Sequence, residues 1–265
     1  MDRRHNYLIY LAIKYRGDWD RIYLACRTKE EYDTAEINAV VNQVLSKCSA
    51  MTMIDEDYPP FLKQVRKPPI VLFYIGDKSL LYHFPYSLAV VGTRNPSSRG
   101  KEITREIVDG LPSNIIIVSG MASGIDTIAH QSAIASGHKT IAVLGCGFNY
   151  CYPSDNWDLY DMLKREYLVV SEYPPDEGPH QSYFPARNRI ISGLTSKCLV
   201  TEASLRSGTM ITATFSLECG KDVMCVPSEN YGDSACNLLL KEGAALVENA
   251  DDVAFIFRDA KYYNG

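Results

Sequence analysis

The stretch FPARNRIISGLTSKCLVTEASLRSGTMITAT, residues 184–214, decides the fold predicted for this chain. A short basic helix over Ala186–Leu194 leads into an apolar strand over Lys197–Thr201, which ends in Glu202. A loop that holds Arg206 comes next, and Ser-Gly-Thr then opens another helix. A helix, a buried strand and a second helix in this order are typical of an α/β sheet.

The same unit recurs on both sides of this stretch. Runs that are apolar throughout indicate strands buried on both faces, which is typical of a parallel sheet. The predicted strands are 88–91, 115–118, 140–144, 168–170, 198–201 and 223–226, and the predicted helices are 98–111, 125–136, 155–165, 186–194, 209–219 and 234–241. The alternation predicts a doubly wound, mostly parallel α/β sheet with right-handed crossovers.

The N-terminal residues have a different pattern. Apolar residues recur at helical spacing over 4–14, 19–26 and 29–47. We therefore expect a small helical domain over 1–54, which is too small to be stable alone and docks on the remainder of the chain.

Prolines separate this domain from the sheet. They interrupt the segment Asp55–Pro69, where they favour extended chain. Ile70–Ile75 is apolar and favours a strand, which we assign to the second domain as an extra edge strand. The second domain is predicted over 55–265, with its core at 87–250.

Composition limits the classes of function. Of the 265 residues, 46% are hydrophobic and the net charge is -5, so an anionic partner would need a local basic patch. The eight cysteines are scattered without a Cys-x-x-Cys pair, which favours reduced thiols and no metal site. The apolar run Tyr7–Ile13 is too short to span a bilayer and lacks a cleavage site, so we expect a cytoplasmic protein without a membrane partner.

The ends of the predicted strands favour a phosphate-binding pocket. Ligands of such sheets bind beyond the carboxyl ends of the strands. Small residues, among them Gly92, Gly120 and Gly124, come after these strands, so backbone can approach a ligand closely. Helices that begin at Ile125 and Thr209 would direct free N–H groups at an anion. The dinucleotide fingerprint and the Walker A motif are both absent.

Arginines are the candidate phosphate ligands in this pocket. Arg94 comes shortly after the first strand, and Arg187 and Arg189 flank Asn188 at the start of the basic helix. We expect the side chains of Arg187 and Arg189 to project to neighbouring positions around that helix. The forked donors of guanidinium suit phosphate, although each arginine also fits an ordinary solvated charge.

Three further ionisable residues are predicted to support the pocket. Glu202 is either a general base or, as we favour, a buried partner that orients Arg94 or Arg189. Asp126 is a cap or dipole partner of its helix. His130 is a hydrogen-bonded packing residue, because no serine and aspartate accompany it at the spacing of a catalytic triad.

Aromatic residues crowd the same rim. Rings interleaved with arginines hold single-stranded nucleic acid without base specificity, although any one ring also suits core packing. The six rings are Phe148, Tyr150, Tyr152, Trp157, Tyr183 and Phe184.

Taken together, these residues resemble the DNA-processing protein A family (DprA, also called Smf). The match lies over 88–247 and keeps the family's order, and its most distinctive part is the Phe-Pro-x-Arg-Asn-Arg block. The matching blocks are 90–94, 119–130, 152–153, 171–173, 184–191, 202–203 and 207–209.

The resemblance implies an extended Rossmann-like domain behind a small N-terminal helical domain. It also implies a protein that binds and protects incoming single-stranded DNA in natural transformation and loads the RecA recombinase, without catalysis or a cofactor. The family's phosphate pocket maps onto Gly92, Arg94, Gly120, Arg187, Asn188 and Arg189. With the positions considered above, the predicted DNA-binding set also includes Gly124, Arg206 and Trp157.

The resemblance further implies a homodimer. Family members dimerise through the end of this domain, which maps onto 237–247 and its apolar residues Leu238, Leu239 and Leu246. Ser154 stands where the family often has a lysine on the DNA path, and stacking by Trp157 would offset that change. Many members carry a C-terminal winged helix, which we do not expect here because the chain stops at Gly265.

The alternative function is a nucleotide-binding enzyme on a related sheet, such as a nucleotide phosphoribohydrolase. In that case Glu202 would act as the acid or base, and Arg94 and Arg189 would bind phosphate. Such enzymes have a Pro-Gly-Gly-x-Gly-Thr loop, whereas the segment Leu205–Thr209 has one glycine and an arginine. A structural adaptor with a vestigial pocket is a third possibility, which the retained arginines disfavour.

Overall fold

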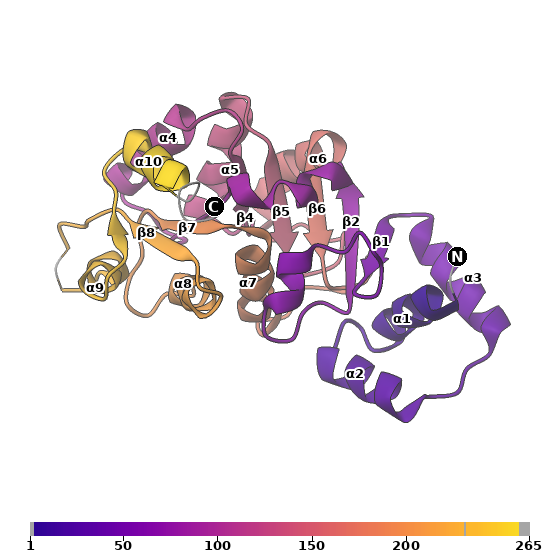
Figure 1. Cartoon of the computed structure of the whole chain (residues 1–265). Helices are drawn as coiled ribbons and strands as arrows, with labels where there is room; N and C mark the ends of the chain where they lie inside the picture. Colours follow the sequence, from indigo (N-terminus) through magenta and orange to yellow (C-terminus); the bar gives the residue numbers. More distant parts are fainter. Residues whose placement is uncertain (1–2, 231, 260–265) are drawn as a thin grey trace.

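The computed structural model describes residues 3–230 and 232–259, and its centre is one mixed sheet with helices on both faces (Figure 1). The strands of this described part are β1 Ser49–Thr52, β2 Val71–Gly76, β3 Ser87–Val91, β4 Ile116–Ser119, β5 Thr140–Leu144, β6 Leu168–Ser171, β7 Lys197–Val200, β8 Asp222–Cys225 and β9 Ala245–Leu246. Its α-helices are α1 Arg3–Lys14, α2 Trp19–Thr28, α3 Thr34–Leu45, α4 Ser98–Gly110, α5 Ile125–Ala135, α6 Trp157–Glu166, α7 Tyr183–Leu194, α8 Thr209–Glu218, α9 Ala235–Lys241 and α10 Ala250–Asp259.

The strand order creates a crevice at the middle of the sheet. The order is β1-β2-β6-β5-β4-β3-β7-β8-β9, with β3 to β9 parallel and β1 and β2 antiparallel at one edge. From β3 the chain builds β4, β5 and β6 outward on one side, and then returns to place β7 on the other side of β3. Such a reversal leaves an opening beyond the carboxyl ends of the two central strands. The predicted doubly wound, mostly parallel α/β fold is confirmed.

Alternate residues of each strand face two different hydrophobic cores. In β4, Val118 packs in the core beneath α7, α8 and α9, whereas its neighbour Ile117 packs beneath α4, α5 and α10. Figure 1 shows these two groups of helices on opposite sides of the sheet. Because both faces are covered, the strands are apolar at nearly every position, and this makes them recognisable in the sequence.

The N-terminal helices dock against the sheet rather than standing apart. Ile9 and Leu11 of α1 share a hydrophobic core with Phe73 of β2, Leu144 of β5 and Tyr160 of α6. All except Leu144 are entirely inaccessible to solvent. This three-helix unit is therefore held at the β1–β2 edge by a common apolar core.

The predicted helical domain contains an unrecognised strand. Residues 49–52, which the prediction places in the domain 1–54, form β1 and pair antiparallel with β2. The predicted helix over 29–47 also begins late, because Lys29 closes α2 in a left-handed conformation and the carboxylate of Asp33 caps α3. The division at residue 54 stays a prediction, and residues 1–2 and 260–265 of the two predicted domains lie outside the described residues.

Helices α6 and α7 also begin at residues other than those predicted. The chain forms a 3₁₀ turn over Ser154–Asn156, so α6 begins at Trp157 and not at residue 155. Helix α7 begins at Tyr183 and not at residue 186, because Pro185 fits the first turn of a helix without losing a hydrogen bond.

The eight cysteines are all described and all free. Within residues 3–230 and 232–259, no helix has both the length and the apolar character needed to cross a bilayer.

Candidate functional site

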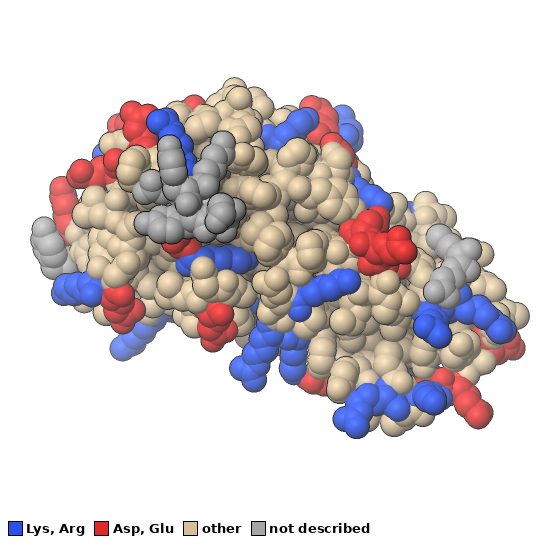
Figure 2. All heavy atoms as spheres, in the orientation of Figure 1, with Lys and Arg blue, Asp and Glu red and all other residues tan. Residues whose placement is uncertain are grey.

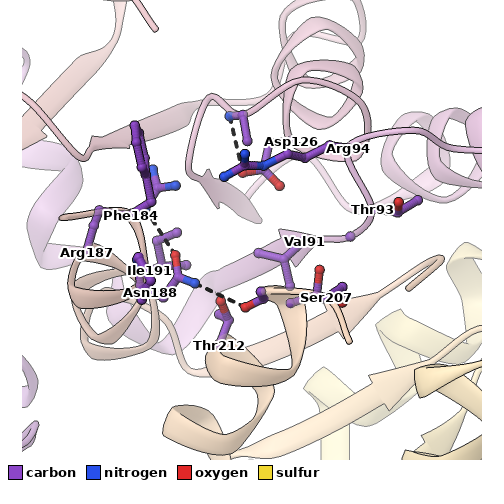
Figure 3. A pocket seen from close by; sticks show the side chains of 15 residues that line it. Val91, Thr93, Arg94, Asp126, Phe184, Arg187, Asn188, Ile191, Ser207 and Thr212 are labelled. Carbon is purple, nitrogen blue, oxygen red and sulfur yellow. Dashed lines mark hydrogen bonds between the residues drawn. The ribbon is translucent and has the colours of Figure 1, made fainter. Parts of the chain in front are cut away.

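A cavity of about 270 Å³ opens where the sheet reverses, beyond the carboxyl ends of β3, β4 and β7 (Figure 3). Its walls come from the loops after these strands and from the N-terminal parts of α7 and α8. The lining residues are Val91, Gly92, Thr93, Arg94, Ala122, Asp126, Phe184, Pro185, Arg187, Asn188, Ile191, Ser207, Gly208, Thr209 and Thr212. We refer to this space as the central cavity.

Arg187 forms the back of the central cavity, and its guanidinium group is hydrogen-bonded to other residues of the chain. Its side chain is buried, and Nη1 donates to the backbone carbonyls of Gly120 and Val143, at the ends of β4 and β5. Nε donates to Oδ1 of Asn188 at 3.1 Å. Burial lowers the pKa of Arg187, and the negative charge of Asp126 counteracts that change. Arg187 therefore anchors α7 to the sheet, in addition to any contact it makes with a ligand.

Glycine is required at positions 120 and 124 because a side chain there would clash with neighbouring protein atoms, and not because a ligand approaches. A Cβ on Gly120 would lie 2.4 Å from the guanidinium atoms of Arg187. Gly124 has a φ of +79°, and a Cβ there would lie 2.4 Å from the carbonyl oxygen of Thr93. Gly120 borders a small hollow of about 60 Å³ beside the central cavity, and Gly124 borders a larger one of about 440 Å³, whereas Gly92 lines the central cavity itself.

Asp126 and His130 lie on α5, behind the loop after β4. The carboxylate of Asp126 accepts hydrogen bonds from the backbone N–H groups of Gly120 at 3.2 Å and Ala122 at 3.4 Å. Burial raises the pKa of Asp126, and the charge of Arg187 opposes that rise. His130 is bound to Oγ1 of Thr140 at 2.7 Å, and burial lowers its pKa to about 3, so the ring is neutral at physiological pH.

Arg94 is the cation at the mouth of the central cavity. It is exposed, and within the described residues no carboxylate lies within 4.0 Å of its guanidinium group. The guanidinium carbon lies 5.8 Å from the ring centre of Phe184, and this ring in turn lies 5.0 Å from that of Tyr152. Arg94 is thus free to bind an anion while resting beside an aromatic surface.

The first turn of α8 faces the same cavity. Gly208 occupies the N-cap position without a side-chain cap, and α8 has no acidic residue in its first turn. Nδ2 of Asn188 donates to the carbonyl oxygen of Gly208 at 3.3 Å, which ties α7 to this turn. Figure 3 shows Arg94 and Ser207 on different sides of the opening. An uncapped helix N-terminus and an unpaired arginine together favour a bound anion.

Arg189 does not belong to the central cavity, and the expectation that it shares a cavity with Arg187 is wrong. Residues two positions apart on a helix point about 200° away from each other around its axis. Arg189 therefore points away from the central cavity. Its Nη2 donates to Oε1 of Glu172, just after β6, at 2.5 Å, and its Nε donates to the carbonyl oxygen of Lys67, in the loop before β2, at 2.8 Å. Its side chain is 7% exposed, so it forms a buried ion pair.

Glu202 orients neither Arg94 nor Arg189, which corrects a second expectation. Its carboxylate accepts hydrogen bonds from the backbone N–H and the hydroxyl of Ser97, the N-cap residue of α4. A Cβ on Gly100 would lie 1.7 Å from Oε2 of Glu202, so the carboxylate packs against the first turn of α4. It stabilises a helix N-terminus, where negative charge is favourable.

Two other predicted contacts lie away from the central cavity. Arg206 is exposed in the loop after β7, and Trp157 is 52% exposed at the start of α6; neither lines the cavity. Lys164 lies 5.8 Å from the Trp157 ring.

Phe148 does not lie at the rim of the site, where the sequence analysis expects it, because its side chain is buried in the core.

Several structurally important positions in and near the site are missing from the predicted site residues. Ile191 and Thr212 line the central cavity one helical turn beyond Asn188 and Thr209, so helical spacing from predicted residues could have indicated them. Glu172, the partner of Arg189, lies within one of the matching blocks, at the end of a strand.

The fold and the cavity define a Rossmann-like α/β protein with a cavity at its topological switch point. Residues 49–257 match the sequence profile of the family described as DNA recombination-mediator protein A. The chain is 41% identical over 218 residues to the DNA processing protein DprA of Streptococcus pneumoniae, covering 82% of this chain and 77% of that protein. It is 37% identical over 201 residues to the Bacillus subtilis protein, covering 75% and 67%. The chain therefore belongs to the DprA/Smf family of DNA recombination mediators.

Solved structures agree with this assignment. The X-ray structure of DprA from Streptococcus pneumoniae has a TM-score of 0.77 at 35% identity, covering 94% of this chain and 92% of that one. DNA processing protein A from Helicobacter pylori, solved to explain its single-stranded DNA binding mode, has a TM-score of 0.73 at 29% identity, covering 81% and 97%. The predicted resemblance is confirmed.

Replacing Arg189 by alanine will lower stability. The change leaves Glu172 buried without its partner, and the loss of one member of a buried ion pair costs about 3–5 kcal/mol. Urea unfolding should report this loss. The matched control is Arg165→Ala, which breaks only the exposed pair with Asp161 and should change stability by about 0.5 kcal/mol or less. Equal stability of the two variants would contradict the structural role of Arg189.

Proposed function

We propose that this protein binds single-stranded DNA at the central cavity and acts as a non-enzymatic recombination mediator. The observation that carries the proposal is the position of Arg94, an exposed and unpaired arginine beside the uncapped N-terminus of α8. Membership of the recombination-mediator family, and the single-stranded DNA binding of the Helicobacter pylori relative, support the choice of ligand.

The charge balance of the central cavity favours phosphate. Arg94 and Arg187 contribute positive charge, and the first turn of α8 adds the positive end of its dipole. Asp126 is the one carboxylate among the residues described as lining the cavity, and it is bound by backbone N–H groups behind the wall. The positive charge is therefore local, in a chain whose acidic and basic side chains are interspersed over the face in Figure 2.

Aromatic rings supply a surface for bases next to the phosphate site. Phe184 lines the central cavity, and the partly exposed ring of Tyr152 lies against it. Stacking on such rings is tolerant of base identity, which suits a protein that binds DNA of any sequence.

The alternative enzyme lacks support at the cavity. Glu202, the acid or base required of a phosphoribohydrolase, is bound to Ser97 and is not among the lining residues. The carboxylate of Asp126 is held in place by the hydrogen bonds that it accepts from backbone N–H groups, so it does not replace Glu202 as the acid or base. We therefore favour binding without catalysis, and without a cofactor.

Protection of incoming DNA, loading of the RecA recombinase, natural transformation and a cytoplasmic location are proposed from family membership. A homodimer is proposed through α9 and β9, where Leu238 is 37% and Leu246 is 55% exposed. Leu239, which the sequence prediction includes in the interface, is 3% exposed and packs in the chain's own core, so it cannot contact a partner.

Replacing Arg94 by alanine will weaken binding of oligothymidine. One phosphate contact in a single strand accounts for about 0.7 in the slope of log K against log salt, and for about five-fold in affinity near 0.1 M salt. Fluorescence titration at several salt concentrations should show both losses, and Arg165→Ala should retain wild-type values. Wild-type affinity and slope in the Arg94 variant would refute the site, and release of free base from nucleoside monophosphates would instead favour the enzyme.

Replacing Leu246 by glutamate will produce a monomer. The charge would have to be buried in the proposed interface, whereas Leu24→Glu changes a similarly exposed leucine on α2 and serves as the control. Sedimentation velocity should give a dimer for wild type and control and a monomer for the Leu246 variant. A dimer in all three proteins would contradict this interface.

A further inference from the structure

A second hollow lies beside the central cavity, on the other side of Arg94. It has a volume of about 440 Å³ and lies between the first two turns of α4 and the first turn of α5. Its walls include Arg94, Lys101, Arg105, Gly124 and Thr127, and Arg94 borders both spaces. We call this hollow the α4 groove.

The α4 groove contains cations that no acidic side chain of the described residues neutralises. Lys101 and Arg105 are exposed and stand one turn apart on the same side of α4. Like charges at this spacing repel each other, so the pair is unfavourable unless an anion lies between or beside them. In the described part of the chain, neither side chain has a carboxylate within 4.0 Å.

Three acidic residues near the groove are engaged elsewhere, and Asp109, one turn beyond Arg105 on α4, lies more than 4.0 Å from the Arg105 guanidinium group. Glu102 and Glu106 of α4 pair with Arg99, at 3.1 Å and 3.5 Å. Asp126 of α5 is buried and accepts hydrogen bonds from the loop before its own helix. The lining of the groove as described therefore contains three cations and no carboxylate, whereas on the Arg99 side of α4 one cation faces two glutamates.

We propose that a DNA strand held in the central cavity continues past Arg94 into the α4 groove, where Lys101 and Arg105 bind its next phosphates. This inference rests on the proposed function, and it extends the proposed DNA-binding site from the central cavity into the α4 groove. Two adjoining hollows with cations in each, joined at one arginine, suit a polyanion with regularly spaced charges better than a single small anion. The groove would therefore add affinity only for strands long enough to reach it.

The test compares the double variant Lys101→Gln/Arg105→Gln with Arg99→Gln, a control on the same helix. Fluorescently labelled oligothymidines of graded length are titrated at several salt concentrations. Both substituted side chains of the double variant are exposed, so thermal unfolding should confirm an intact fold. For the shortest strands that bind, we expect the double variant to match wild type. For longer strands it should lose about 1.4 in salt slope and roughly 25-fold in affinity near 0.1 M salt, while the control changes neither.

Three results would overturn the inference while leaving the proposed function in place. The double variant could match the control at every length, or it could lose affinity equally for short and long strands. It could also lose affinity only for duplex DNA of the same length. If wild-type protein itself fails to bind oligothymidine at any length, the proposed function fails, and this inference fails with it.

Discussion

The buried guanidinium of Arg187 is the interaction on which the rest of the site depends. Taking an arginine out of water costs several kcal/mol unless its charge and its donors are matched. Here the carbonyl groups of Gly120 and Val143 accept its hydrogen bonds, and Asp126 supplies opposite charge. These contacts hold α7 against the ends of β4 and β5. They also exclude any side chain at position 120, because a Cβ there would meet the guanidinium group.

The three arginines predicted for the site consequently have different functions. Arg187 anchors α7 at the back of the cavity, and Arg189 fastens the other side of the same helix to Glu172 and to the carbonyl of Lys67. Arg94 is left exposed at the opening, where it lies beside the Phe184 ring and has room for an anion. A helix fixed by two buried arginines thus presents one aromatic ring and one amide to a ligand, and a third arginine provides exposed charge beside them.

The fold was predictable because strands buried on both faces are apolar at consecutive positions, as in β4. Strand β1 has no such apolar run, since it is four residues long and partly exposed at an edge. The arginine roles were only partly predictable. Sequence places Arg187 and Arg189 on one helix, but their partners Gly120 and Glu172 lie 67 and 17 residues away. The wrong expectation for Glu202 has the same origin, because Ser97 is 105 residues distant.

The most direct test of this account is a crystal structure of the protein with bound oligothymidine. The account predicts a phosphate oxygen within hydrogen-bonding distance of the Arg94 guanidinium and of a backbone N–H at the start of α8. It also predicts that Arg187 keeps its contacts with the carbonyl groups of Gly120 and Val143. A strand bound on another face, or an Arg187 side chain that leaves these carbonyl groups to bind phosphate, would contradict it.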